Sequence, residues 1–472
     1  ALALLAAPQG SDLPVDPLPP VSNPEITAEE LRYHVAYLAS DELRGREAGT
    51  PDAVRAARYL ARVLEEEGLD PAGDGGTYLQ RVPLSRTRHL AAPELMVTLE
   101  DGSVHRVANG IEARVSQRGE PSPTEELAVL RVAAPEDLPD AADPHVALFL
   151  DASRKEGREW LEAKGLDAES GWGLVLETSP GKRGRREVTP RGGALRPVRE
   201  GPDPCDRVRL KGEARDWLTS GRVESVKLVY HLLVERVDDY NVLGRIDGVG
   251  TAEHPELARE VIVFSAHYDH LGVRETKEPG EDGIYNGADD DASGTAAVLE
   301  VAQALAAGDA PARTLIFLLA AGEEKGLLGT NYYIEHPVAP LDRTVCNLNF
   351  EMLGRPDPLA GGPGKMWLTG FERSNLGPAF QDLGLSVIQD PRPDQNFFQR
   401  SDNYAFAVRG IVAQTLSSYN LHEDYHHVSD ETEAIDFEHM RAALVGAMAG
   451  IRALVSGEIR PEWAPGGRPG GR

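Results

Sequence analysis

The stretch that decides the fold is residues 261–272, which read VIVFSAHYDHLG. It begins with an apolar run, Val261–Phe264, of the kind found in strands that are buried on both faces of a parallel sheet. Two residues with metal-binding side chains, His267 and Asp269, come shortly after the run. Because ligands of open α/β sheets bind beyond the carboxyl ends of the strands, this stretch predicts a buried strand with a functional site at its end.

Three further apolar runs come later in the chain, at Thr314–Ala321, Val345–Phe350 and Gly410–Thr415. Between the first and second runs, apolar residues recur at helical spacing from Ala296 to Leu305, and Ser293 is a candidate N-cap for that helix. Alternating strands and helices predict an α/β fold in which a mixed, mostly parallel sheet is flanked by helices.

Metal-ligand side chains accompany each of these runs. They are His267 and Asp269 after the first run, Asp289, Asp290 and Asp291 before the helix, Glu323 and Glu324 after the second run, Glu351 after the third, and Asp424, Tyr425, His426 and His427 after the fourth. Since the carboxyl ends of parallel strands meet at one edge of a sheet, we expect these residues to gather there.

Each of these residues taken alone has an ordinary explanation, because single histidines and acidic triplets are common in cores and at helix starts. Together they favour a metal, since buried carboxylates without a cation cost several kcal/mol per ion. Imidazoles and carboxylates without thiolates suit a hydrolytic zinc site, and this many carboxylates suits two ions about 3.5–4 Å apart. Adjacent Glu323 and Glu324 point in different directions, so one can bind metal while the other handles a proton.

Six motifs resemble those of the co-catalytic zinc aminopeptidases of peptidase family M28, in the same order and spacing. They are SAHYDHLG at 265–272, NGADDDASG at 286–294, AGEEKGLLG at 321–329, NFEMLG at 349–354, SDNYAFA at 401–407 and DYHHVSD at 424–430. The resemblance covers about residues 27–90 and 235–455, and it implies the zinc aminopeptidase or phosphorylase/hydrolase-like fold.

The resemblance also implies two Zn²⁺ ions and a role for each site residue. His267 and Glu351 would bind one zinc, Glu324 and His426 the other, and Asp290 would bridge both through a turn with a cis peptide between Asp290 and Asp291. Glu323 would be the general base, Asp269 would orient His267, and Tyr425 would donate a hydrogen bond to the oxyanion.

Two positions depart from the usual pattern of the family. Glu351 stands where Asp is frequent, and His427 follows His426 where Thr is common, so His427 competes with His426 as a candidate ligand. We expect His270 and His422 to support the site rather than to bind metal.

The function implied by the resemblance is that of a secreted or periplasmic, zinc-dependent exopeptidase acting on peptide substrates. Its most direct form is an aminopeptidase that uses a zinc-bound hydroxide with Glu323 as general base. Three alternatives remain open on the same scaffold. A carboxypeptidase or dipeptidase requires a cation, such as Arg400 or Arg409, to bind the substrate carboxylate. A glutaminyl cyclase-like enzyme uses a single zinc ion. An inactive, receptor-like binding module is expected to have lost metal ligands or the general base.

The length of 472 residues predicts more than one folding unit. We expect an extended leader or signal remnant at 1–26, N-terminal helices of the peptidase domain at 27–90, an inserted α/β lobe at 91–222, the di-zinc peptidase domain at 223–458 and a flexible tail at 459–472. A strand, a helix and a strand are predicted between 145 and 177 in the inserted lobe. Related enzymes often carry a protease-associated domain at this position in the chain, and this lobe is compared with that domain only by analogy of fold.

Composition narrows the possible partners. The hydrophobic fraction of 41% and the charged fraction of 26% are ordinary globular values, and the net charge of −27 repels nucleic acid. No apolar run approaches the roughly 18 residues needed to span a bilayer, so stable membrane insertion is not expected. Cys205 and Cys346 lie in no paired motif, which argues against a disulfide framework. The sequence leaves the oligomeric state open.

Overall fold

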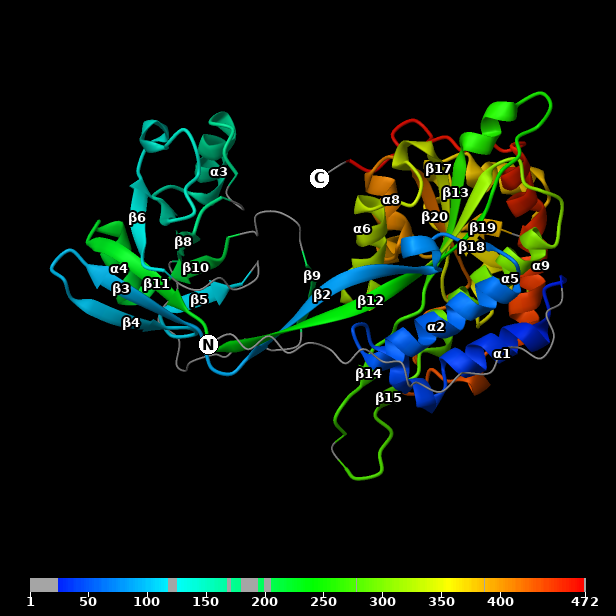
Figure 1. Ribbon diagram of the computed structural model, residues 1–472, viewed down its shortest axis with the longest axis horizontal. Coiled ribbons are helices and arrows are strands. Elements are labelled where there is room, and N and C mark those ends of the chain that lie inside the picture. Colours follow the sequence, from blue (N-terminus) through cyan, green and yellow to red (C-terminus); the bar gives the residue numbers. More distant parts are fainter. Residues whose placement is uncertain are drawn as a thin grey trace. The chain divides into compact units, whose positions relative to one another are not determined.

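The computed structural model describes residues 24–470 apart from 118–124, 168–170, 180–193, 199–204, 277 and 386. These residues form two compact units (Figure 1). The small unit is Ser85–Arg236, and the large unit comprises residues 24–84 and 237–470. Most of the leader predicted at 1–26, residues 1–23, lies outside the described residues.

A mixed sheet forms the centre of the large unit. In spatial order its strands are β19 (Val387–Gln389), β18 (Met366–Leu368), β20 (Val412–Ser417), β17 (Thr344–Phe350), β13 (Val261–His267), β16 (Thr314–Ala320), β12 (Leu232–Ile246) and β2 (Leu79–His89), with β1 (Asp70–Pro71) paired to β12. The chain continues from β2 into the small unit and returns through β12. The four predicted strands are β13, β16, β17 and β20, which are adjacent and parallel, so this prediction is confirmed. The short β14 (Gly272–Val273) and β15 (Ile284–Tyr285) pair separately.

Helices cover both faces of this sheet (Figure 1). Ile262 and Phe264 of β13 belong to a core shared with α1 (Ala28–Leu38), α2 (Pro51–Glu66), α5 (Gly294–Ala306), α7 (Leu376–Asp382) and α9 (Phe437–Ser456). Val261 and Val263 point the other way, into a core shared with α6 (Leu328–Glu335) and α8 (Asn403–Val408). The alternation follows from the two-residue period of a strand, and it explains why the whole run is apolar.

Capping residues set the starts of the first helices. Thr27 caps α1 by accepting a hydrogen bond from the backbone of Glu30, and Thr50 caps α2 ahead of Pro51. Ser293 stands at the predicted N-cap position of α5, but its side chain does not cap the helix. It has helical backbone angles, and its hydroxyl accepts a hydrogen bond from the backbone of Leu353 and donates one to the carbonyl of Asp289.

The small unit contains its own sheet. In spatial order the strands are β4 (Val104–Ala108), β3 (Glu94–Leu99), β11 (Val223–Val229), β6 (Leu127–Val132), β7 (Val146–Leu150), β8 (Leu174–Thr178), β10 (Arg207–Leu210) and β5 (Ala113–Ser116). Helix α3 (Arg154–Ala163) lies between β7 and β8, and α4 (Gly212–Thr219) follows β10. The range predicted for the inserted lobe, 91–222, falls within this unit, and its likeness to a protease-associated domain stays a prediction.

The C-terminal segment differs from the flexible tail predicted at 459–472. Within the described part, the indole of Trp463 donates a 2.9 Å hydrogen bond to the carbonyl of Gly410, and the backbone of Ala464 donates to Arg373. Trp463 also packs against the apolar core beside α8. The many glycines and prolines of this segment are typical of a solvated tail. The contacts of Trp463 nevertheless attach the segment to the large unit.

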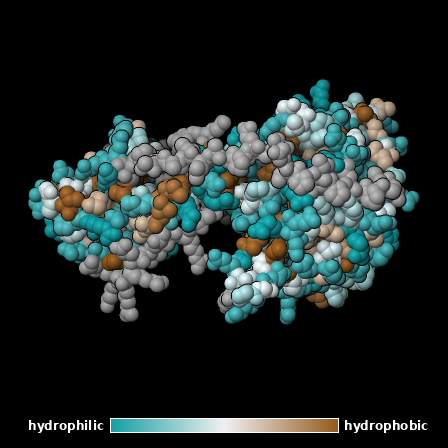
Figure 2. Space-filling view, turned by 60° about the horizontal axis from the view of Figure 1, so that its bottom comes forward, coloured by the Kyte–Doolittle hydropathy of each residue, from teal (hydrophilic) through white to brown (hydrophobic). Residues whose placement is uncertain are grey.

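The surface suits a highly charged chain. On the face shown in Figure 2, hydrophilic side chains cover most of the described surface, and apolar side chains occur in scattered patches. Among the described residues, no helix combines the length and apolar character required to cross a membrane.

Candidate metal site

The candidate ligands come from strand ends that the fold brings together. His267 is the last residue of β13, Glu323 and Glu324 begin the short helix η6 (Glu323–Lys325) just after β16, and Glu351 follows β17 directly. Asp290 lies in the irregular turn η5 (Ala288–Ser293) ahead of α5. Because β13, β16 and β17 are parallel neighbours, their carboxyl ends meet at one edge of the sheet.

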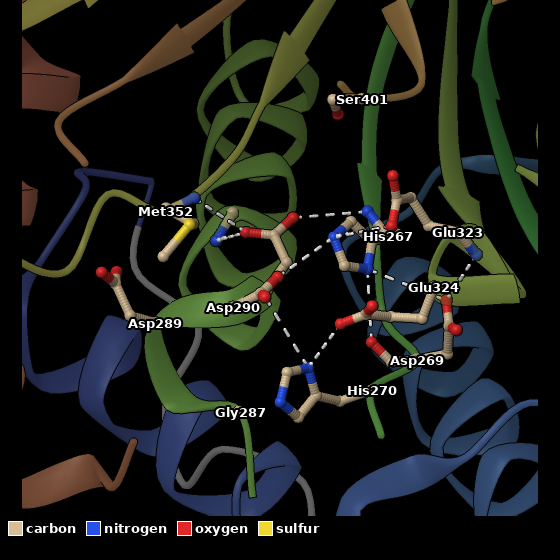
Figure 3. Close-up of polar contacts among 12 residues, drawn as sticks. His267, Asp269, His270, Gly287, Asp289, Asp290, Glu323, Glu324, Met352 and Ser401 are labelled. Carbon is tan, nitrogen blue, oxygen red and sulfur yellow. Dashed lines mark hydrogen bonds and ion pairs between the residues drawn. The ribbon is translucent and has the colours of Figure 1, made fainter. Parts of the chain in front are cut away.

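Asp290 lies between two imidazoles (Figure 3 shows the contact with His267). Its Oδ1 is 3.4 Å from Nε2 of His267, and its Oδ2 is 3.1 Å from Nε2 of His426. The same His426 nitrogen is 3.3 Å from Oε1 of Glu324. One carboxylate that faces two histidines with different oxygens is the arrangement that a bridging metal ligand requires. The peptide between Asp290 and Asp291 is cis, as expected.

The second histidine of the HYDH motif, His270, was expected to support the site rather than to bind metal, but it offers a possible ligand atom within the same cluster. Nδ1 of His270 is 2.9 Å from Oε1 of Glu324 and 3.9 Å from Oδ2 of Asp290 (Figure 3). His270, Asp290 and Glu324 each offer a ligand atom, and the three atoms lie within 4.8 Å of one another. The sequence signal that could have indicated a ligand role for His270 was its position only three residues after His267.

Several polar atoms of this cluster have no hydrogen-bond partner among the described residues. They are Nε2 of His267, both ring nitrogens of His270 and Oε1 of Glu324. All are buried, and although three of them lie 2.9–3.4 Å from a neighbouring charged group, none of these contacts has the geometry of a hydrogen bond. Buried polar atoms are almost always paired, since an unpaired one costs about 1–3 kcal/mol. A cation bound by these lone pairs would satisfy them, so the donor set of nitrogens and carboxylate oxygens fits zinc.

Electrostatics of the cluster point to the same conclusion. Burial raises the pKa of Glu323 well above its usual range, and burial together with Asp290 and Asp402 raises the pKa of Glu351 to about 7. Burial lowers the pKa of His426, but the nearby carboxylates of Asp290 and Glu324 outweigh burial and raise the pKa to about 9. Carboxylates that resist ionisation beside an imidazole that holds its proton indicate a site with excess negative charge, which a metal ion would neutralise.

The remaining predicted residues flank the cluster. The ring nitrogen Nδ1 of His267 is 3.2 Å from the backbone carbonyl of Asp269 and 3.7 Å from its Oδ1, so the closer contact is with the carbonyl rather than the carboxylate. The Tyr425 ring stacks on His426 with centroids 3.9 Å apart. His427 is exposed and, within the described part of the chain, has no ion pair with the site carboxylates, whereas His426 has two.

Two distant residues hold the backbone of the site, and neither was foreseen. The carboxylate of Asp430 accepts hydrogen bonds of 3.0–3.1 Å from the backbone N–H groups of Asp289 and Asp290. Arg46, which is fully buried, donates to the carbonyls of Tyr268 and Gly287 at 2.6 and 3.0 Å. These bonds fix the two loops that carry His267, His270 and Asp290.

A parallel sheet whose strand ends gather imidazoles and carboxylates around a cation site defines the class of metal-dependent hydrolases. Residues 241–448 match the family model described as peptidase family M28, so this part of the chain is an M28 metallopeptidase domain.

Curated relatives match over short segments. Leupeptin-inactivating enzyme 1 of Streptomyces exfoliatus is 43% identical over 74 residues, which is 15% of this chain and 17% of the relative. Aminopeptidase YwaD of Bacillus subtilis is 28% identical over 148 residues, which is 31% of this chain and 28% of the relative. The chain therefore spans less than a third of the length of these relatives. Among solved structures, the aminopeptidase from Aneurinibacillus sp. strain AM-1 is 18% identical with a TM-score of 0.46, covering 90% of this chain and 93% of that one.

Proposed function

We propose that this protein is a zinc-dependent exopeptidase, and specifically an aminopeptidase that releases N-terminal residues from peptides. The observation that carries the proposal is the position of Asp290 between His267 and His426, with Glu323 beside them. The M28 family and the aminopeptidase among the relatives support it.

Five residues would hold two zinc ions: His267, Asp290, Glu324, Glu351 and His426. His270 is close enough to Glu324 to compete with or assist His426. When bound, zinc supplies Lewis-acid activation of the scissile carbonyl and of water. A hydrogen bond from Ser401 opposes the rise in the pKa of Glu351 that burial causes, so Ser401 favours the charged form of this carboxylate.

Glu323 is the residue best placed to move a proton. Its Oε2 lies 3.9 Å from Nε2 of His267, and its side chain is 13% exposed, so a substrate can reach it. The carboxylate would accept a proton from the attacking water and return it to the amine that leaves, which is the work of a general base followed by a general acid. Burial raises its pKa, which strengthens the carboxylate as a proton acceptor in the first of these steps.

Tyr425 and Asp269 would complete the chemistry. Tyr425 lines a pocket together with Glu351, so its hydroxyl is available to donate a hydrogen bond to the developing oxyanion. Asp269 accepts a hydrogen bond of 2.9 Å from the backbone N–H of Glu323 and lies beside His267, so it positions both the base and a ligand.

The excess of carboxylates favours an aminopeptidase, because a substrate's free ammonium group is attracted to them. Of the two arginines considered for a carboxypeptidase, Arg400 lines the pocket beside Glu351. Arg409 lies just before β20, at the end of that strand opposite to the site, and therefore cannot serve a substrate there.

The test compares substrates that differ in their free ends. The zinc-loaded protein is assayed with aminoacyl-aminomethylcoumarins and with N-blocked peptides that carry a free C-terminus, each with and without a chelator. We expect chelator-sensitive release only from the aminoacyl substrates, and about two zinc equivalents by elemental analysis. Hydrolysis of N-blocked peptides alone indicates a carboxypeptidase, and one zinc with glutaminyl cyclisation indicates a cyclase. Fractionation of the cells that make the protein tests the proposed secreted or periplasmic location.

A further inference from the structure

A pocket walled by aromatic side chains adjoins the metal site. The rings of Trp367 and Phe397 are stacked with centroids 5.1 Å apart, Phe397 and Tyr419 are 5.7 Å apart, and Tyr419 and Tyr425 are 5.3 Å apart. The pocket also contains Glu351, a proposed ligand. If the protein is the proposed aminopeptidase, the side chain of the substrate residue next to the scissile bond enters this pocket. The aromatic walls would then contact the apolar part of that side chain.

Arg400 places a positive charge at this pocket. Its guanidinium carbon lies 5.2 Å from the centre of the Phe397 ring, and its Nη2 is 3.5 Å from the hydroxyl of Tyr425. In the part of the chain that the structure describes, no carboxylate forms an ion pair with Arg400, although the chain has a net charge of −27. Burial raises the pKa of Tyr419 to about 12, and the charge of Arg400 opposes that rise, so its field reaches into the pocket.

The wall of the pocket includes one further donor residue, Trp367. The indole Nε1 of Trp367 is buried in a residue that is 2% exposed, and it has no hydrogen-bond partner among the described residues. Tryptophan can only donate, and an arginine likewise offers donors alone. A pocket whose apolar wall adjoins a guanidinium with no carboxylate partner among the described residues is complementary to an apolar stem that ends in oxygen acceptors.

We propose that this pocket binds the side-chain carboxylate of an acidic N-terminal residue, with Arg400 as its charged partner, so that the preferred substrates begin with glutamate or aspartate. The inference rests on the proposed aminopeptidase function. The same guanidinium repels lysine and arginine side chains, so basic N-terminal residues are disfavoured.

The experiment uses glutamyl and glutaminyl substrates, which differ in charge but little in shape. The zinc-loaded wild type, Arg400→Gln and the control Arg409→Gln are assayed with glutamyl-, glutaminyl- and leucyl-aminomethylcoumarin. We expect the wild type to prefer glutamyl over glutaminyl by about tenfold in kcat/KM, mainly through KM, which is the usual size of one hydrogen bond to a charged group. Arg400→Gln should bring this ratio close to one, and Arg409→Gln should retain it.

Two further measurements keep the test decisive. Free glutamate should inhibit leucyl hydrolysis by the wild type more strongly than free glutamine, and Arg400→Lys, which retains the charge, should preserve part of the preference. A wild type that cleaves glutaminyl as well as glutamyl substrates, or a ratio that Arg400→Gln leaves unchanged, overturns the inference while leucyl hydrolysis still supports the aminopeptidase. Cleavage of N-blocked peptides alone overturns both, because Arg400 would then bind a main-chain carboxylate.

Discussion

The backbone N–H of Glu323 donates a hydrogen bond of 2.9 Å to Oδ1 of Asp269. Asp269 follows β13 and Glu323 follows β16, so this bond joins the ends of two neighbouring parallel strands. The proposed base is thus held through its main chain, which leaves its side chain free to exchange a proton. Its neighbour Glu324 instead contacts His270 and His426 through its side chain.

This difference predicts different outcomes for Glu323→Gln and Glu324→Gln. We expect Glu323→Gln to keep its zinc and its fold but to lose about 10²- to 10⁴-fold in kcat, because only the proton acceptor is removed. Glu324→Gln should lose zinc, and added zinc should restore part of its activity. Elemental analysis and kcat measured on both variants check the prediction. The roles must be exchanged if Glu323→Gln is the variant that loses metal.

The two adjacent histidines after β20 give a second comparison. His426 contacts Asp290 and Glu324, whereas His427 is exposed. We therefore expect His426→Ala to weaken zinc binding by at least about tenfold and His427→Ala to leave it unchanged. Competition with a chromogenic chelator measures both. Equal weakening by the two substitutions would show that His427 also binds metal.

A buried carboxylate away from the metal site predicts a pH-dependent stability. Burial, reinforced by the charge of Glu30, raises the pKa of Glu300 from its ordinary 4.5 to about 8. Between these values the folded protein holds a proton that the unfolded chain has released, so this group's contribution to stability is complete below about pH 4.5 and is lost as the pH rises through 8.

We expect Glu300→Gln, which cannot ionise, to gain thermal stability relative to the wild type as the pH is raised from 5 to 8.5. The exposed Glu335 of α6 provides the control, and Glu335→Gln should follow the wild-type curve. Scanning calorimetry at several pH values checks both. A Tm difference between Glu300→Gln and the wild type that does not change with pH contradicts the assignment.

Arg46 predicts a stability effect of a different kind. Removing its guanidinium in Arg46→Met leaves the buried carbonyls of Tyr268 and Gly287 without donors, so we expect a loss of about 3 kcal/mol or more in the free energy of unfolding. Arg44→Met is the matched control. The Arg44 side chain is 59% exposed and its contact with Asp52 spans 3.7 Å, so its loss should cost less than about 1 kcal/mol. Denaturant unfolding of both variants tests the difference.

The sequence predicted those parts of the fold that depend on short-range patterns. Continuous apolar runs indicated β13, β16, β17 and β20, and the residues after them indicated where ligands gather. Asp430 and Arg46 could not be found in this way, because each lies more than 130 residues from a backbone group that it holds. The cap assigned to Ser293 failed because a tertiary contact replaced the local one: its hydroxyl also accepts a hydrogen bond from the backbone of Leu353.

His426 and Asp430 lie four residues apart on one loop, and they act on the same turn from two sides. His426 contacts the side chain of Asp290, and Asp430 accepts the backbone N–H of that same residue. Metal binding and the ordering of this loop are therefore thermodynamically linked. A metal ion bound by His426 and Asp290 restricts the conformations of the loop, and an ordered loop holds these two ligands in place for the ion. Loss of zinc should accordingly accelerate amide hydrogen exchange at Asp289 and Asp290, while the amides of β13 retain their protection because the sheet does not depend on the ion.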